Sequence, residues 1–341
     1  MEFLSQYGLF LAKAITMVVG LLVVIGTIAG LSSKIRKSAR GELEVHRLNE
    51  DFEHMGNTLQ VAMLNPAEQK QLAKEQKKEA KLRKKMVSDK KRVFLLNFKG
   101  DMRASAATNL REEITAVLSQ SKSEDEIVVR LESAGGMVHS YGLASSQLDR
   151  IKKRGIPLTV CVDKVAASGG YMMACVADKI LAAPFSILGS IGVVAQLPNF
   201  NRLLKKHDID VELHTAGEHK RTLTMFGENT DQDREKFVED LEDTHQLFKD
   251  FVGQRRQEVD IDRISTGEIW LGTRAKEKGL VDELMTSDEY LVNLSSDADI
   301  YEVKYTHRKS LPEKMGLAAE NSTDRLLLRW WNRLRSNQYY S

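Results

Sequence analysis

Buried strand-like runs that alternate with helix-like segments constrain the fold of this chain more than any other feature. VFLLNF (93–98), EIVVRLES (126–133) and PLTVCV (157–162) are rich in apolar residues, which is typical of strands buried on both faces of a sheet. Between these runs, residues 106–119 and 141–154 have apolar residues at helical spacing. Strands and helices in this order predict an α/β domain with a mostly parallel sheet.

Two more strands and a long helix extend this domain. We expect strands at KILAAP (179–184) and DVELHTA (210–216), followed by an amphipathic helix over residues 231–258. The apolar residues near one face of that helix are Phe237, Leu241, Phe248 and Val252. No internal repeat is visible, so we predict a single catalytic-type domain over residues 93–300.

The most apolar segment is LFLAKAITMVVGLLVVIGTIAGL (9–31), in which Lys13 is the only charged residue. As a helix it would be about 34 Å long, which exceeds the roughly 30 Å hydrocarbon core of a bilayer. The alternative is a cleaved signal peptide, but residues 27–29 form a weak cleavage site. We therefore predict a single-pass transmembrane helix within residues 1–40.

Two polar segments flank the predicted domain. Residues 41–92 are expected to form a charged, Lys-rich helical linker that is solvated or partly disordered, with contact to anionic lipid as an alternative. Residues 301–341 form a tail in which DRLLLRWWNRLR (324–335) interleaves Arg with Leu and Trp. This amphipathic helix could bind the membrane interface or pack on a neighbouring subunit.

Composition excludes several classes of protein. The chain has 50 Lys and Arg against 48 Asp and Glu, a net charge of +2. A dedicated nucleic-acid-binding protein usually carries a large basic surplus, so we expect no nucleic-acid partner. Cys161 and Cys175 are the only cysteines, too few for a disulfide framework or a Cys-rich zinc site. We expect both to be buried, one in a strand and one in a helix.

The segment KVAASGGYMMA (164–174) is the most informative for chemistry. Ser168 lies between small residues and the pair Gly169-Gly170, which suits a sharp strand-to-helix turn that exposes a nucleophile, although the G-x-S-x-G spacing is absent. The alternative is a tight helix entry in which Ser168 is only the N-cap residue. These residues taken alone favour the N-cap interpretation.

A serine nucleophile needs a base. None of the 8 histidines lies in a recognisable triad context. A lysine base must have its pKa lowered from about 10.4 to about 7–8, which requires roughly 4 kcal/mol of destabilisation of the charged form by desolvation. Lys220, in TAGEHKRT (215–222), follows a predicted strand and is a candidate. The composition of this loop equally suits an ordinary exposed lysine.

Four segments together resemble a known family. AASGGYMMA, GSIGVV (189–194), AGEHKRT and GEIWLGTRAKEKGLVDEL (267–284) occur in an order and spacing similar to those of membrane-bound signal peptide peptidase A family serine proteases, and the chain is most similar to the SohB-type branch. The resemblance covers nearly the whole chain. It implies a ClpP/crotonase-like superhelical fold built from ββα units and a catalytic Ser/Lys dyad.

The resemblance also implies roles for individual residues. Ser168 corresponds to the nucleophile, Lys220 to the general base, and Gly136 and Gly169 to the backbone donors of the oxyanion hole. No metal or organic cofactor is implied. The family usually has Pro where this chain has Ala134, which makes the turn less rigid and the assignment of Gly136 less secure. His219 stands where many members have Tyr, and we interpret it as a loop-packing residue.

The predicted function is that of a serine endopeptidase. It would hydrolyse peptides, such as cleaved signal peptides or unfolded segments, through an acyl-enzyme intermediate. The alternatives are a proteolytically inactive, membrane-tethered scaffold on the same fold, and crotonase-type acyl-CoA chemistry. The second alternative does not need a Ser/Lys pair, and no nucleotide-recognition motif is visible.

Assembly and membrane side are further expectations. Related single-domain enzymes form rings or domes in which a neighbour supplies the lysine, so we predict a homo-oligomer, an octamer, with active sites shared between subunits. The family's better-known members place this domain outside the cytoplasm, so we expect an anchor in the inner membrane and favour the periplasmic side for the catalytic domain. The basic residues after the apolar segment favour the cytoplasmic side instead. They are Lys34, Arg36, Lys37 and Arg40.

Overall fold

The computed structural model describes residues 41–83, 90–217 and 219–306. The predicted anchor at 9–31, its basic flank and the tail helix at 324–335 lie outside these residues. Within the described part of the chain, no helix is both long enough and apolar enough to cross a membrane.

The chain divides into two units. Residues 45–304 form the larger one, and the described residues of the other are 41–44 and 305–306. In this second unit the Thr306 hydroxyl donates a hydrogen bond to the Glu44 carboxylate at 2.9 Å. All site residues discussed below belong to the larger unit.

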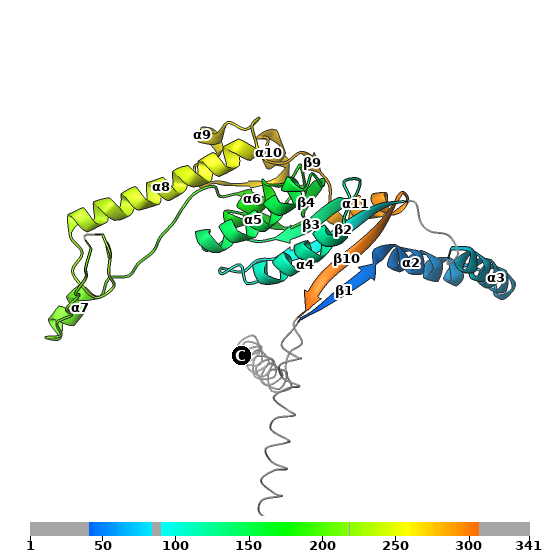
Figure 1. Cartoon of the computed structure of the whole chain (residues 1–341), viewed down its shortest axis with the longest axis horizontal. Coiled ribbons are helices and arrows are strands. Elements are labelled where there is room, and N and C mark those ends of the chain that lie inside the picture. Colours follow the sequence, from blue (N-terminus) through cyan, green and yellow to red (C-terminus); the bar gives the residue numbers. More distant parts are fainter. Residues whose placement is uncertain (1–40, 84–89, 218, 307–341) are drawn as a thin grey trace, which may run out of the picture. The chain divides into compact units, whose positions relative to one another are not determined.

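Strands and helices alternate through most of the described chain (Figure 1). In chain order the elements are β1 (Glu42–Arg47), α2 (Leu48–Met63), α3 (Pro66–Arg83), β2 (Lys91–Lys99), α4 (Ala107–Gln120), β3 (Glu126–Glu132), α5 (Val138–Lys153), β4 (Leu158–Val162), β5 (Val165–Ala167), α6 (Gly169–Ala174), β6 (Lys179–Ala182), β7 (Ile187–Gly189), α7 (Asn201–Lys206), α8 (Asp231–Arg255), α9 (Ile261–Ile264), β8 (Ile269–Leu271), α10 (Gly272–Glu277), β9 (Glu283–Leu284), α11 (Ser287–Ser295) and β10 (Ala298–Thr306).

Two sheets organise the fold. The larger has the strand order β1-β10-β2-β3-β4-β6-β9, and its pairs from β10 through β9 are parallel. The smaller has the order β5-β7-β8, with β5 and β7 parallel and β7 and β8 antiparallel. The prediction of a mixed α/β domain with a mostly parallel sheet is therefore confirmed.

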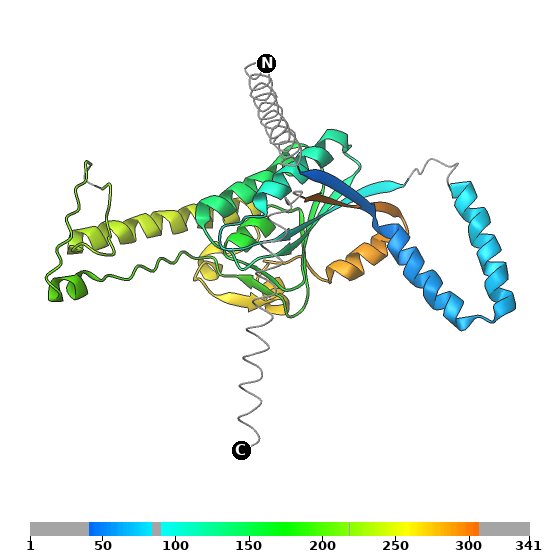
Figure 2. The ribbon, with the colours of Figure 1, turned by 90° about the horizontal axis from the view of Figure 1, so that it is seen from below.

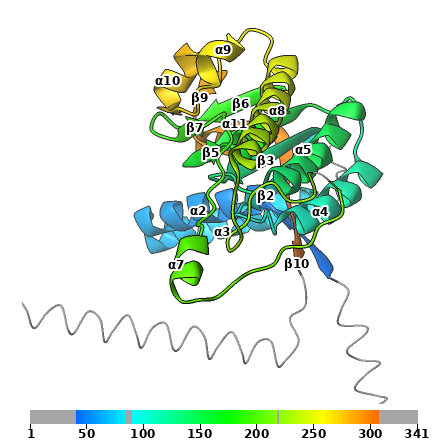
Figure 3. The same ribbon diagram turned by 90° about the vertical axis from the view of Figure 1, so that its left-hand side faces the viewer.

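The larger sheet is buried on both faces because successive strand residues point to opposite sides. In β3, Val129 and Leu131 lie in a core that also contains residues of α4, α5 and α6. Val128, between them, lies in a second core with Leu291 of α11, against which Phe52 of α2 packs. Figure 3 shows α4 and α5 together on one side of β2 and β3. This two-sided burial explains why the strand sequences are apolar at consecutive positions.

One predicted strand is wrong. Residues 210–216 form no strand, and Ile209, Val211 and Leu213 are 50%, 43% and 52% exposed. Apolar and polar residues alternate in this segment, which is the sequence pattern of a half-buried strand. A strand also needs hydrogen bonds from a neighbour, and no strand of the described chain pairs with this segment.

The predicted long helix is present as α8 but is buried over only part of its length. It begins after a capping box formed by Thr230 and Asp233, an arrangement that satisfies free backbone groups at a helix start. Phe248 and Val252 are buried, whereas Phe237 and Leu241 are only half-buried. Figures 1 and 2 show the N-terminal half of α8 running out beyond the larger sheet.

Part of the segment predicted as a linker contacts the domain. Asn49, at the start of α2, is 7% exposed. Its amide nitrogen donates to the carbonyl oxygens of Ser295 and Ala298, and its amide oxygen accepts from the Ile300 N–H at 2.8 Å. The domain boundary at residue 92 stays a prediction, but α2 is attached to α11 and β10 by these bonds.

Both cysteines are buried and unpaired, as predicted. Cys161 lies in β4 as expected, whereas Cys175 is the residue that follows α6 and not part of a helix. Burial raises the pKa of the Cys161 and Cys175 thiols from 9.0 to about 12. The folded state therefore favours the protonated thiols, and this contribution to stability is lost as the pH rises from about 9 toward 12.

We expect neither thiol to react with Ellman's reagent at pH 8 in the folded full-length protein, and both to react after unfolding in guanidinium. The thiolate is the reactive species, and at this pH it is almost absent from the folded state. Absorbance at the released thionitrobenzoate band measures the reaction. A thiol that reacts within seconds in the native protein would contradict the burial described here.

Candidate active site

Ser168 occupies a strained turn between β5 and α6. Its backbone has φ 52° and ψ −122°, a conformation that costs a residue with a side chain about 1–3 kcal/mol. Its N–H donates to the Gly189 carbonyl at 2.8 Å, and its carbonyl accepts from the Met172 N–H at 2.9 Å. The backbone is thus held by β7 on one side and by α6 on the other.

The Ser168 side chain does not cap α6. A helix N-cap residue normally has an extended backbone and a side-chain oxygen that accepts an N–H from the first turn. Ser168 has neither feature, and its hydroxyl makes no hydrogen bond within the described residues. Ser168 therefore occupies the N-cap position of α6, as the alternative predicted, but its side chain does not cap the helix. The hydroxyl is left available for other chemistry.

The strand before Ser168 is held on both sides. β5 pairs with β7, with Ala167 opposite Gly189. On its other side, the Ser133 N–H donates to the Val165 carbonyl at 2.8 Å, and the Ala167 N–H donates to the Ser133 carbonyl at 3.0 Å. Because Ser133 follows β3 directly, the carboxyl ends of β3, β5 and β7 lie together, and Ser168 follows at this common edge.

A second turn, Ala134-Gly135-Gly136, lies against the first. Gly135 has φ 90°, and a Cβ atom there would lie 2.7 Å from the Ser168 Cβ and 2.8 Å from the Gly169 nitrogen. Only glycine allows this approach without displacement of the Ser168 turn. Sequence reasoning assigned Gly136 and did not single out Gly135, although the tandem glycines after a strand were a visible sign of a close backbone approach.

The N–H groups on either side of Gly136 donate hydrogen bonds within the fold, whereas that of Gly136 does not. The Gly135 N–H donates to the Ser133 hydroxyl at 3.1 Å, and the Met137 N–H donates to the Met102 carbonyl at 2.9 Å. The Gly136 N–H between them has no acceptor within the described chain, and neither does the Gly169 N–H at the start of α6. Two free donors in turns that meet at Ser168 are what an oxyanion hole requires; the assignment itself stays a prediction.

Lys220 is not brought to Ser168 within one chain. Its side chain is exposed and makes no hydrogen bond or ion pair among the described residues. Its backbone N–H donates to the Gly217 carbonyl at 3.2 Å. His219 is exposed as well, and no described histidine forms a hydrogen bond with Ser168. One chain therefore supplies the predicted nucleophile and donors without the predicted base.

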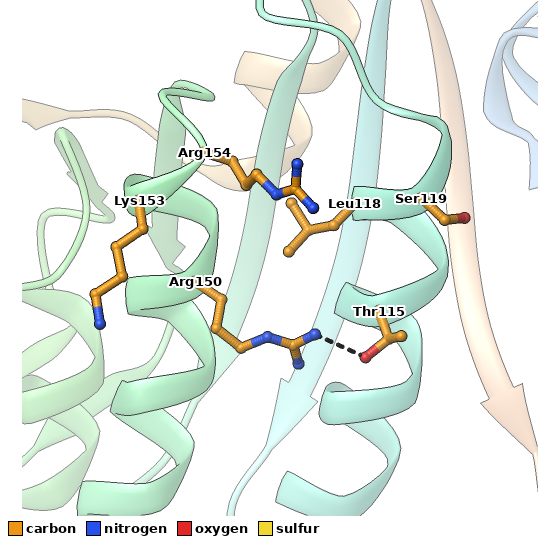
Figure 4. Close-up of a pocket in the computed structure, with 6 residues that line it drawn as sticks. All are labelled: Thr115, Leu118, Ser119, Arg150, Lys153 and Arg154. Carbon is orange, nitrogen blue, oxygen red and sulfur yellow. Dashed lines mark hydrogen bonds between the residues drawn. The ribbon is translucent and has the colours of Figure 1, made fainter.

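A separate surface groove lies between α4 and α5 (Figure 4). It has a volume of about 460 Å³ and is lined by Thr115, Leu118, Ser119, Arg150, Lys153 and Arg154. One Arg150 guanidinium nitrogen donates to the Thr115 hydroxyl at 2.9 Å. None of the predicted site residues lines this groove. No group of three or more potential metal ligands is found in the described part of the chain.

Comparison with known proteins identifies the family. The model described as Peptidase family S49 N-terminal matches residues 2–148, and that described as Peptidase family S49 matches residues 150–301. The chain belongs to peptidase family S49. The resemblance to SohB-type proteases is confirmed by curated relatives, and the chain is accordingly a peptidase.

Two of these relatives are described as "Probable protease SohB". The one from Haemophilus influenzae is 50% identical over 341 residues, which cover 96% of each chain. That from Buchnera aphidicola subsp. Schlechtendalia chinensis is 48% identical over 305 residues, which cover 86% of this chain and 100% of the relative. A solved structure of a membrane-bound stomatin-specific protease with a substrate peptide has a TM-score of 0.41 and 13% identity, covering 67% of this chain and 97% of its own. That structural likeness is too weak to support a conclusion.

We expect the Ser168→Gly variant of this S49 peptidase to be more stable than the Ser168→Ala variant. Glycine relieves the positive φ, whereas alanine keeps it, and the net gain in unfolding free energy should be about 1 kcal/mol. Urea unfolding of both full-length variants in detergent measures the difference. The control is Ala167→Gly in β5, where the same loss of a side chain should destabilise by about 1 kcal/mol. A Ser168→Gly variant less stable than Ser168→Ala would show that the turn is not strained.

Proposed function

We propose that this S49 peptidase is a membrane-anchored serine endopeptidase with Ser168 as the nucleophile and Lys220 as the general base. The observation that carries the proposal is the meeting of two turns at Ser168. Ser168 has a free hydroxyl at a strained position, and the two turns that meet there carry the Gly136 and Gly169 N–H groups, which lack acceptors among the described residues. We further propose a ClpP/crotonase-like superhelical fold, which the parallel sheet and its successive helical connections support.

The proposed reaction is acyl transfer followed by hydrolysis. The neutral amine of Lys220 removes the Ser168 proton as the hydroxyl oxygen attacks a peptide carbonyl. The tetrahedral oxyanion accepts hydrogen bonds from the Gly136 and Gly169 N–H groups, each typically worth about 10²- to 10³-fold in rate. Lys220 returns the proton to the leaving amine, and a water molecule then hydrolyses the ester to Ser168.

The base is proposed to come from a neighbouring copy of the chain. Lys220 is exposed in the single chain, yet a lysine base must be desolvated to lose its proton. Burial at an interface between copies would supply that desolvation. The exposed apolar side chains Ile209, Val211 and Leu213, which precede Lys220, support packing of this segment against another subunit. An octamer is the assembly we propose.

The substrates are proposed to be unfolded or membrane-released peptide segments. The Met137 N–H donates to the Met102 carbonyl beside Gly136. Met102 and Met137 are 68% and 42% exposed. Flexible apolar side chains beside the Gly136 turn suit apolar substrate residues. We place the enzyme in the inner membrane through residues 9–31, with the catalytic domain on the periplasmic side.

A fluorophosphonate probe tests whether Ser168 is a nucleophile. We expect the full-length protein in native membranes to be labelled, and Ser168→Ala to abolish labelling while its unfolding midpoint stays unchanged. Ser190→Ala is the matched control, because Ser190 also has φ 52° in a turn after a strand and is expected to be dispensable for labelling. Absence of labelling in the wild-type protein would favour the inactive scaffold instead.

Mixing two inactive variants tests whether the active site is shared. Ser168→Ala and Lys220→Ala should each abolish peptide hydrolysis. Co-expressed in equal amounts, they should recover about a quarter of wild-type activity, since a random cyclic assembly pairs an intact serine with an intact neighbouring lysine at that frequency. No recovery from assemblies shown by mass spectrometry to contain both variants would contradict a shared site.

A further inference from the structure

A buried chain of hydroxyl groups lies behind the turns that meet at Ser168. Tyr141 in α5 is 0% exposed and Ser133 after β3 is 2% exposed. The Ser133 Oγ and Tyr141 Oη atoms are 2.6 Å apart, and the Tyr141 hydroxyl donates to the Asp101 carbonyl at 2.8 Å. The Gly135 N–H donates to Ser133 Oγ at 3.1 Å. A continuous series of hydrogen bonds thus links the Gly135 N–H, the Ser133 and Tyr141 hydroxyls and the Asp101 carbonyl.

The direction of every bond in this chain is determined by the groups at its two ends. A carbonyl oxygen can only accept, so Tyr141 must give its one hydroxyl hydrogen to Asp101. Ser133 must then donate its own hydrogen to Tyr141 Oη, and its oxygen accepts from the Gly135 N–H. Burial also raises the pKa of Tyr141, so its hydroxyl keeps the proton on which this order depends.

Tyr141 contacts both turns, not only one. Its hydroxyl reaches Gly135 through Ser133, while its ring lies against Gly169. A Cβ atom at Gly169 would be 2.4 Å from the Tyr141 Cγ atom. The helix α5, which carries Tyr141, packs beside α6, which begins at Gly169 (Figure 1). One side chain therefore supports the segments that carry both free N–H groups.

The far end of the chain is fixed by the loop that contains Asp101. The Asp101 carboxylate accepts the N–H groups of Arg103 and Ser105, and these bonds, with the Ser105 bond largest, lower the pKa of the carboxyl. The next residue, Met102, accepts the Met137 N–H. The same loop thus holds Met137 directly and Gly135 through the hydroxyl chain, and the Gly136 N–H lies between these two attachments.

We propose that Tyr141 and Ser133 are positioning residues that hold the Gly136 and Gly169 N–H groups in the orientation needed to stabilise the oxyanion. This inference rests on the proposed function. Ala134 stands where the family usually has a proline that would make the turn rigid. The hydroxyl chain of Ser133 and Tyr141 would supply that rigidity instead. Rigid donors stabilise the charge that develops in the transition state and contribute little to binding of the neutral peptide.

The main test compares Tyr141→Phe with Tyr171→Phe in the full-length protein. Tyr171 is the matched control, because it is also 0% exposed and its hydroxyl donates to a backbone carbonyl, that of Leu280, at 3.0 Å. Tyr141→Phe loses two buried hydrogen bonds and Tyr171→Phe loses one, so both unfolding midpoints should fall, that of Tyr141→Phe by more. Only Tyr141→Phe should lower kcat, by about 10- to 100-fold with KM within about twofold. The rate of fluorophosphonate labelling of Ser168 should fall with kcat.

Ser133→Ala and the double variant test whether the two residues act as one chain. Ser133→Ala removes the acceptor of the Gly135 N–H and should also lower kcat without raising KM. The kcat of the double variant should then lie within about twofold of the kcat of the slower single variant. The effects of substitutions within one hydrogen-bond network are not additive. If Tyr141→Phe does not fold, the kcat and KM of Ser133→Ala decide the matter.

Each outcome supports or overturns the proposal. Equal losses of kcat in Tyr141→Phe and Tyr171→Phe, wild-type kcat in Tyr141→Phe and Ser133→Ala, or an effect on KM alone would each overturn it. In all these cases the wild-type protein is still labelled at Ser168, so the proposed function survives. A wild-type protein that is not labelled at Ser168 overturns the proposed function, and the positioning role with it.

Discussion

The pairing of β5 between the end of β3 and β7 is the constraint on which the rest of the site depends. Ser133 bonds to both Val165 and Ala167, and Gly189 bonds to Ser168. Because all three segments run parallel, their carboxyl ends meet at one edge. Backbone hydrogen bonds therefore place the Ser168 turn and the tandem-glycine turn. The hydroxyl chain of Ser133 and Tyr141 then links the tandem-glycine turn to Asp101.

The sequence predicted the elements that local pattern determines. β2, β3 and β4 were found because burial on both faces leaves an apolar run long enough to recognise. β5, β7 and β8 have three residues each, too few to show a period. The strand predicted at residues 210–216 was wrong because alternating apolar and polar residues indicate a half-buried surface. They do not show that a neighbouring strand is available for pairing. The attachment of α2 to α11 and β10 was missed because the hydrogen bonds that make it come from Asn49, a polar residue in a segment whose composition suits a solvated linker.

The site was predictable to a similar degree. Ser168 stood out through its small neighbours, and Lys220 was one candidate base in a loop that suits an ordinary exposed lysine equally well. The assignment of Lys220 as the base, and of Gly136 and Gly169 as donors, came from resemblance to a family. Ser133 and Tyr141 gave no signal, since a serine after a strand and a tyrosine in an amphipathic helix are ordinary core residues. What distinguishes them is that one line of hydrogen bonds connects them to Asp101 and Gly135, a property of three-dimensional contact that no spacing in the sequence encodes.

The strained backbone at Ser168 has an evolutionary consequence. A φ of 52° disfavours every residue that has a side chain, so the fold itself would prefer glycine at position 168. Cellular quality control, which responds to unfolding, would not remove such a variant. Under the proposed function, only selection for turnover keeps a serine at this position, so a lineage that had abandoned the chemistry should drift to glycine here early.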